Sequence, residues 1–160
     1  MTIQVGDRLP ALTLTTMTAE GPKPVVVEEL CEGKKVVIFA VPGAFTPTCS
    51  AQHVPGFIEN HEALKTKGVD LIVCISVNDP FVMGAWGKDR EVGDSMLMLS
   101  DGNGEFTAAI GLEMDGSGFG LGTRSQRYAM IVDDGVVSSL NVESGPGLDV
   151  SSAETILSAL

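Results

Sequence analysis

The chain has few basic residues, few cysteines and no long hydrophobic run. Its 160 residues include 10 lysines and arginines against 21 aspartates and glutamates, a formal net charge of -11. A phosphate backbone requires a basic face on its protein partner, so this charge argues against nucleic-acid binding. It also argues against an anionic membrane surface, and no stretch approaches the ~18 apolar residues of a membrane span.

The three cysteines, Cys31, Cys49 and Cys74, do not form the pattern of a secreted disulfide framework. The N-terminus also lacks the basic and apolar regions of a secretory signal. We therefore expect a cytoplasmic protein, in which a cysteine is more often inert or catalytic than structural. The length and a hydrophobic share of 44% predict one folded domain over residues 1–160.

The hydrophobic pattern alternates between strands and helices along the chain. We expect strands at residues 11–15, 25–27 (after a Gly/Pro turn at 21–24), 35–41, 70–77, 96–99, 127–132 and 136–141. We expect helices at 49–67 with a kink at Pro55, at 81–90 after an Asp79 N-cap and Pro80, at 106–110, and from Ser151 or Ser152 to Leu160. This order indicates an α/β fold with a mixed central sheet flanked by helices.

Cys49 stands in the stretch VPGAFTPTCS, where a buried strand has ended and a helix begins. A helix start offers unpaired amides and the positive end of the dipole, and both stabilise a thiolate. Thr46 adds a hydroxyl, while Pro42 and Pro47 stiffen the loop and remove amide donors. The alternative is a buried cysteine at an ordinary helix start, but the Pro/Thr pattern favours a nucleophile.

The other two cysteines have simpler interpretations. Cys74 lies in the apolar run LIVCISV, which is typical of a core residue, although a thiol that resolves oxidised Cys49 is the functional alternative. Cys31 stands beside three glutamates, which disfavour a thiolate, so we interpret it as structural or incidental.

Two further patterns point to binding sites only weakly. A Cys-x3-His pair, Cys49 and His53, could be half of a zinc site, but a second ligand pair is missing and a packed histidine is the better interpretation. The glycine-rich run 116–122 leads into a strand rather than opening a helix, so we predict a flexible connection and no phosphate loop.

Arg124 and Arg127 are two of only ten basic residues. One interpretation is a salt bridge to one of the many acids. The other is that one arginine faces Cys49, where its fork of donors would stabilise the thiolate and orient an oxygen substrate.

The stretch PGAFTPTC, from Pro42 to Cys49, resembles the peroxiredoxin active-site pattern Pro-x3-Thr-x2-Cys. VPGAFTPTCSAQHVPGF, CISVNDPFVMGAW and RSQRYAMIVDDGVV resemble the type II branch, which includes plant type II enzymes and mammalian peroxiredoxin V. The resemblance runs from about Val5 to the last helix. It implies a thioredoxin-like fold with an N-terminal extension, commonly a homodimer, and chemistry without metal, haem or flavin.

The resemblance also implies a role for each matching residue. Cys49 would be the peroxidatic cysteine, whose thiolate attacks a peroxide oxygen and becomes sulfenic acid. Thr46 would hydrogen-bond the thiolate and the peroxide, Pro42 would shield the sulfur, and Arg127 would hold the thiolate and polarise the O–O bond. The backbone amides of Thr48 and Cys49 would complete the set of donors.

Two differences from the enzymes that this chain resembles affect how oxidised Cys49 is reduced back to the thiol. Val150 stands where mammalian peroxiredoxin V has its resolving cysteine, whereas Cys74 matches a second cysteine of the plant enzymes. In similar proteins, glutaredoxin with glutathione, or thioredoxin, restores the thiol. The leading hypothesis is a thiol peroxidase that reduces hydrogen peroxide and alkyl hydroperoxides. A redox-sensing or chaperone-like binding protein is the alternative, and a metal-binding module a distant third.

Overall fold

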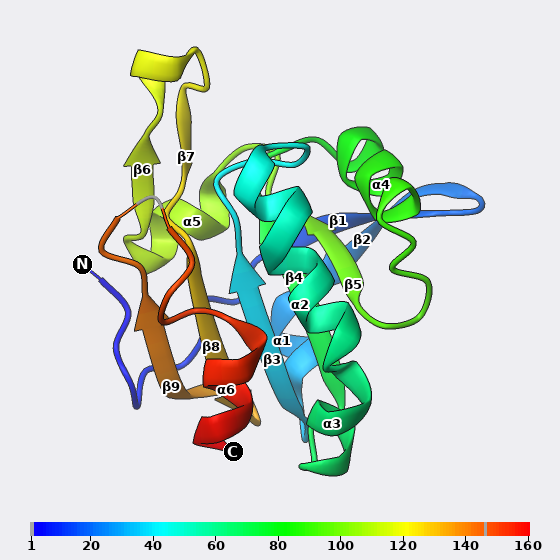
Figure 1. Cartoon of the computed structure of the whole chain (residues 1–160), viewed down its shortest axis with the longest axis vertical. Helices are drawn as coiled ribbons and strands as arrows, with labels where there is room; N and C mark the ends of the chain where they lie inside the picture. The colour runs from blue at the N-terminus through cyan, green and yellow to red at the C-terminus, as the bar shows by residue number, and fades with distance from the viewer. Residues whose placement is uncertain (1, 146) are drawn as a thin grey trace.

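The computed structural model describes residues 2–145 and 147–160, and a seven-stranded mixed sheet forms its centre (Figure 1). The strand order is β2-β1-β5-β4-β3-β8-β9. The strands are β1 (Thr13–Thr18), β2 (Gly21–Val26), β3 (Lys35–Ala40), β4 (Leu71–Ser76), β5 (Leu97–Ser100), β8 (Tyr128–Asp133) and β9 (Val136–Val142). Strands β3, β4 and β5 run parallel, and the remaining pairs are antiparallel. The predicted α/β class with a mixed sheet is confirmed.

Helices cover both faces of the sheet, which explains the continuous apolar runs of β3 and β4. The helices are α1 (Val27–Cys31), α2 (Val54–Glu59), α3 (His61–Thr66), α4 (Pro80–Asp89), α5 (Glu105–Ile110) and α6 (Ala153–Ala159). One hydrophobic cluster joins the sheet to α2, α3, α4 and α6, and a second joins its other face to α1 and α5 (Figure 1). Among the residues described, no helix combines the length and hydropathy needed to cross a membrane.

Two helix starts follow the capping signals in the sequence. The Asp79 carboxylate accepts a hydrogen bond from Val82 N at 2.8 Å, and Pro80 is the first residue of α4. The Ser152 hydroxyl accepts one from Thr155 N at 3.2 Å and so caps α6. In each case a side-chain oxygen satisfies an amide that has no partner within the helix.

The sequence predicted the turn of the β8–β9 hairpin at one edge of the sheet correctly and that of the β1–β2 hairpin at the other edge incorrectly. Asp134 and Gly135 join β8 to β9 with φ angles of 48° and 82°, as the predicted tight turn requires. The Gly/Pro turn predicted at 21–24 is wrong, because these residues lie within β2 and the chain turns before them. Strand β2 is an edge strand, where a proline loses no ladder hydrogen bond on its solvent side.

The glycine-rich run is an ordered hairpin rather than the predicted flexible connection. Strands β6 (Glu113–Asp115) and β7 (Thr123–Ser125) pair antiparallel, with a 3-10 turn at Ser117–Phe119 between them. The hairpin projects from the body of the molecule, beside the end from which the helix of Cys49 starts (Figure 1). It therefore forms a wall next to the candidate site.

Candidate active site

The segment after β3 enters a helix directly before Cys49. Residues 47 and 48 are already helical, and Ser50 N donates to the Thr46 carbonyl oxygen at 3.0 Å, so Cys49 is the third helical residue. Pro47 suits the first position because an N–H there would have no helical partner. The amides of Thr48 and Cys49 are among the first of the helix, which lack intrahelical acceptors. The backbone therefore places Cys49 beside free donors.

The turn that carries Cys49 is a π-helix, Cys49–His53, in which Val54 N donates to the carbonyl oxygen five residues back. Pro55 follows directly and has no N–H, so the widened turn takes the place of the predicted kink. The helix ends at Asn60, whose side chain bonds back to a carbonyl oxygen of α2. The single helix predicted over 49–67 is therefore wrong.

Arg127, directly before β8, reaches both Cys49 and His53. Its Nη2 donates to Cys49 Sγ at 3.0 Å, and its Nη1 donates to His53 Nδ1 at 2.9 Å. Of the two interpretations of the arginines, the structure shows the one in which Arg127 faces the sulfur. Arg124 instead holds the loop, with Nη1 donating to the Pro42 carbonyl oxygen at 3.4 Å.

His53 is a part of the site that the sequence interpretation underrated. It does pack as predicted, with its ring 4.7 Å from that of Phe39 between centroids. However, Nδ1 accepts from Arg127, so Nε2 carries the hydrogen and donates to the Ser151 carbonyl oxygen at 2.8 Å. Burial, and then the Arg127 charge, lower the pKa of His53 from 6.5 to about 3, so the ring is neutral.

The geometry of His53 also bears on the zinc alternative. Both ring nitrogens are engaged by protein groups, which leaves none for a metal ion. Within the described ranges 2–145 and 147–160, no group of three or more histidines, cysteines or carboxylates is placed to hold a metal. The spacing of four residues from Cys49 was the one signal in the sequence that pointed to His53.

Thr46 and Pro42 lie in the loop beside Cys49. The Thr46 hydroxyl donates to the Gly43 carbonyl oxygen at 2.7 Å. Its hydrogen is therefore not directed to the Cys49 sulfur, which is a correction to the predicted donation. The oxygen keeps lone pairs that can accept a hydrogen bond from a substrate hydroxyl.

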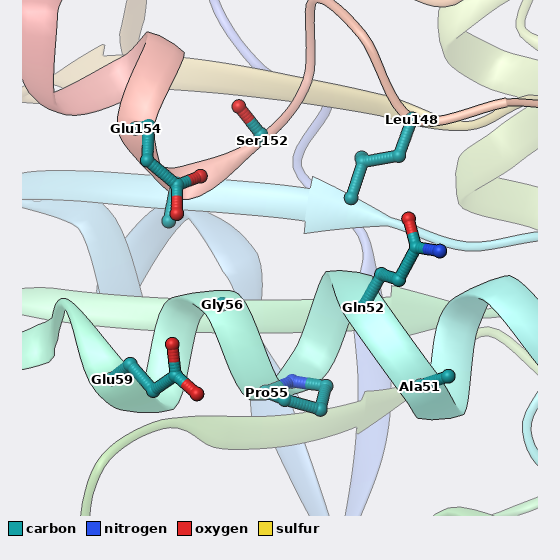
Figure 2. A pocket seen from close by; sticks show the side chains of 9 residues that line it. Ala51, Gln52, Pro55, Gly56, Glu59, Leu148, Ser152 and Glu154 are labelled. Carbon is teal, nitrogen blue, oxygen red and sulfur yellow. The ribbon is translucent and has the colours of Figure 1, made fainter.

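A groove of about 750 Å³ extends from this loop to the β6–β7 hairpin. Thr46, Thr48 and Arg127 line one part of it, and Phe119 and Leu121 of the hairpin line another. A second hollow, of about 410 Å³, lies between the helix after Cys49 and the C-terminal segment (Figure 2). The groove, and not this hollow, is lined by residues of the loop that precedes Cys49.

Cys74 and Cys31 are buried and free, as is Cys49, among the residues that the structure describes. Burial raises the pKa of the Cys74 thiol well above its usual value, and the charge of Cys49 raises it further. Burial also raises the pKa of Cys31 to about 11, against a small lowering by Lys34. Cys31 is thus inert because of burial, rather than because of the neighbouring glutamates.

Comparisons with known proteins agree with this geometry. The Redoxin family matches residues 4–157. The chain is 54% identical to Peroxiredoxin-2E, chloroplastic, of Arabidopsis thaliana over 99% of this chain and 69% of the relative. It is 57% identical to Peroxiredoxin-2E-2, chloroplastic, of Oryza sativa subsp. japonica over 99% of this chain and 73% of the relative. A crystal structure of reduced Prx3 from Vibrio vulnificus in complex with H2O2 is 57% identical and covers 99% of each chain, with a TM-score of 0.95.

The names of the two plant relatives contradict the predicted cytoplasmic location, because both are called chloroplastic. The prediction rested on the number and spacing of the cysteines and on the lack of a secretory signal pattern at the N-terminus. Free thiols distinguish a reducing from an oxidising environment, but they do not identify one reducing compartment among several.

Proposed function

This chain belongs to the Redoxin family, and within it to the peroxiredoxins, and we propose that Cys49 carries its thiol-dependent peroxidase activity. The observation that supports this assignment most directly is the 3.0 Å hydrogen bond from Arg127 Nη2 to Cys49 Sγ. A guanidinium in this position stabilises a thiolate, which is the nucleophilic form of cysteine. The thioredoxin-like fold supplies the helix start at which the sulfur lies.

In the proposed reaction, the Cys49 thiolate attacks the terminal oxygen of a hydroperoxide. A sulfur–oxygen bond forms, the O–O bond breaks, and the electron pair of that bond leaves with the other oxygen. That oxygen takes a proton from water and departs as water or an alcohol, while Cys49 becomes sulfenic acid. Hydrogen peroxide and alkyl hydroperoxides are the proposed substrates.

The residues around the sulfur act on the charge that moves during this step. Arg127 and the amides of Thr48 and Cys49 are donors that are fixed before the reaction, so they stabilise the developing charge without reorganising. The Thr46 oxygen accepts from the peroxide hydroxyl, and Pro42 limits access of water to a sulfur that is already buried. Each role is part of the proposal.

Peroxiredoxins act on peroxide together with a thiol reductant, and here we propose an external one. Val150 offers no resolving thiol, and Cys74 is fully buried with a raised pKa, so it is a poor nucleophile. Glutaredoxin with glutathione, or thioredoxin, can reduce the sulfenic acid from outside, through the groove beside Thr46.

We further propose a homodimer. Phe45 and Phe81 are 53% and 66% exposed, and the Phe45 ring lies 6.4 Å from that of Trp86 on α4. Phe45 also has a φ of 64°, which is unusual for a bulky residue. Exposed aromatic side chains of this kind favour contact with a second copy.

The assignment of Cys49 is tested by peroxide consumption with each reductant system. Cys49→Ser is expected to abolish turnover, because a hydroxyl is a far weaker nucleophile than a thiolate. Cys31→Ala, which also removes one buried thiol, is expected to retain it. Turnover at the wild-type rate in Cys49→Ser would rule out the assignment.

A further inference from the structure

Hydrogen bonds continue from the site into the C-terminal segment. His53 Nε2 donates to the Ser151 carbonyl oxygen at 2.8 Å. The amide and the hydroxyl of Ser151 both donate to Glu143 Oε2, at 2.8 and 2.7 Å. The same oxygen accepts from the amides of Asp149 and Val150, at 2.8 and 2.9 Å. Glu143 Oε2 therefore fixes the backbone of residues 149–151, and this backbone in turn accepts the hydrogen bond from His53.

The series of bonds closes on the residue from which it starts. Glu143 N donates to the Arg127 carbonyl oxygen at 2.9 Å. A ring thus runs from the Arg127 guanidinium through His53, Ser151 and Glu143 to the Arg127 backbone. A side chain that is tied to its own backbone through three other residues has little freedom to rotate.

Burial strengthens the part of this ring that lies next to the sulfur, whereas Glu143 is only partly buried. His53 and Ser151 are 0% exposed and Arg127 is 6% exposed. Hydrogen bonds are stronger in such a low-dielectric interior, and breaking one leaves a buried polar group without a partner.

His53, the acceptor for Arg127 Nη1, is uncharged, and this suits an arginine that stabilises the Cys49 thiolate. Arg127 forms no ion pair with a carboxylate among the residues described, and a neutral imidazole occupies that position. A carboxylate partner would offset the positive charge that the sulfur needs. A neutral imidazole fixes Nη1 and leaves the charge for Nη2 and the sulfur.

We propose that Glu143, Ser151 and His53 are positioning residues that set the Arg127 guanidinium against the Cys49 sulfur and the peroxide. This inference rests on the proposed role of Cys49 and adds to it. Glu143 acts at a distance, through the 149–151 backbone, although it also borders the groove.

Two rates measured on the full-length reduced protein test the proposal. One is the oxidation of Cys49 by hydrogen peroxide, and the other is its alkylation by iodoacetamide. Both rates are compared at the alkaline plateaus of their pH profiles, so that a loss of thiolate stabilisation by Arg127 does not enter. Alkylation then requires no alignment of an O–O bond. A loss of alignment therefore lowers the first rate more than the second, whereas general damage to the fold changes both.

His53→Phe keeps an aromatic ring beside Phe39 and removes both hydrogen bonds. We expect the oxidation rate to fall about 10- to 100-fold, which is the scale of a misplaced catalytic group, with alkylation changed by about twofold or less. Glu143→Ala is expected to lower oxidation in the same selective way, and Glu143→Gln to restore most of it, because an amide oxygen can accept where Oε2 does.

Asp149→Ala is the matched control. It removes a carboxylate from the same loop, and the bonds of Asp149 to Glu143 and Thr155 come from its backbone. Wild-type rates are expected for this variant. If His53→Phe does not fold, the Glu143 pair decides the question.

Folded Glu143→Ala with wild-type oxidation would overturn the positioning role, as would equal losses in both rates. Equal oxidation by Glu143→Ala and Glu143→Gln would overturn it too. These outcomes leave the role of Cys49 intact, whereas a wild-type protein whose Cys49 resists hydrogen peroxide would contradict the proposed function itself.

Discussion

At the scale of single residues, the two terminal nitrogens of the Arg127 guanidinium have different partners and different roles. Arg127 Nη2 donates to Cys49 Sγ, while Nη1 is held by His53. A lysine in its place would keep the charge but would lack the planar fork that makes both bonds in one fixed geometry.

Arg127→Lys is therefore expected to oxidise at Cys49 roughly 10²- to 10³-fold more slowly, the usual effect of removing one positioned donor. Stopped-flow measurement with hydrogen peroxide would give the rate. Arg8→Lys is the control, since Arg8 contacts the Asp134 carbonyl oxygen at the opposite end of β8. An unchanged rate in Arg127→Lys would show that charge alone is sufficient.

Cys74→Ser is expected to retain most peroxidase activity with glutathione and glutaredoxin. The thiol is fully buried on β4, and burial raises its pKa well above the usual value, so little thiolate is available to attack oxidised Cys49. Steady-state turnover of this variant checks the expectation. Near-complete loss with that system would instead identify Cys74 as the resolving cysteine.

The sequence predicted some residues of the site and missed others for a physical reason. The spacing of Pro42, Thr46 and Cys49 is local, so the loop and the helix start could be predicted. The contact of His53 with Arg127 joins positions 74 residues apart, and its tautomer depends on Ser151. No local pattern carries that information.

At the scale of elements, α4 supports the π-helical turn of the active site. Trp86 Nε1 donates to Ser50 Oγ at 2.9 Å, and Arg90 Nη1 donates to the Ser50 carbonyl oxygen at 3.1 Å. Bonds from a neighbouring helix compensate for the irregular backbone next to Cys49.

The start of α4 depends on the Asp79 cap. Asp79→Ala is expected to lower the free energy of unfolding by about 1 kcal/mol, because the Val82 amide loses its acceptor. Urea unfolding would measure the change, and Asp79→Ser, which can still cap, should lose much less. Equal losses in the two variants would show that capping is not the cause.

The sequence predicted elements whose signals are local and missed those that depend on neighbours. The Asp-Gly turn and the Asp79 cap are examples of the first kind. The first four residues of β2, which include two prolines, were expected as a turn and form a strand through pairing with β1, while the expected strand at 25–27 overlaps only the end of β2. The β6–β7 hairpin contains several glycines and is likewise defined by its pairing.

For the whole molecule, acid is expected to destabilise the fold through His53. Burial, and then the Arg127 charge, lower the pKa of this histidine from 6.5 to about 3. Between these values the unfolded chain binds a proton that the folded chain does not. The free energy of unfolding therefore falls as the pH falls, by roughly 3 kcal/mol between pH 6.5 and 4 from this group.

Glu143 also makes the free energy of unfolding fall as the pH falls. Partial burial raises its pKa, but the hydrogen bonds from residues 149–151 lower it by more, so the stability it adds is lost as the pH falls through its folded pKa. Urea unfolding of the wild type and His53→Phe across this range isolates the histidine, and the variant should show the shallower slope. Parallel slopes would contradict the account of a neutral buried His53.

The fold class of the whole molecule could be predicted because alternating strand and helix patterns determine it. The compartment could not, since composition does not specify it. The single domain over residues 1–160 and the homodimer remain predictions.

The most direct test of the central claim is the mass of the reduced protein after one equivalent of hydrogen peroxide, with peptide mapping of the modified residue. Rapid addition of one oxygen at Cys49 is expected, with Cys31 and Cys74 unchanged. Unmodified Cys49, or faster oxidation at either of the other two cysteines, would contradict it.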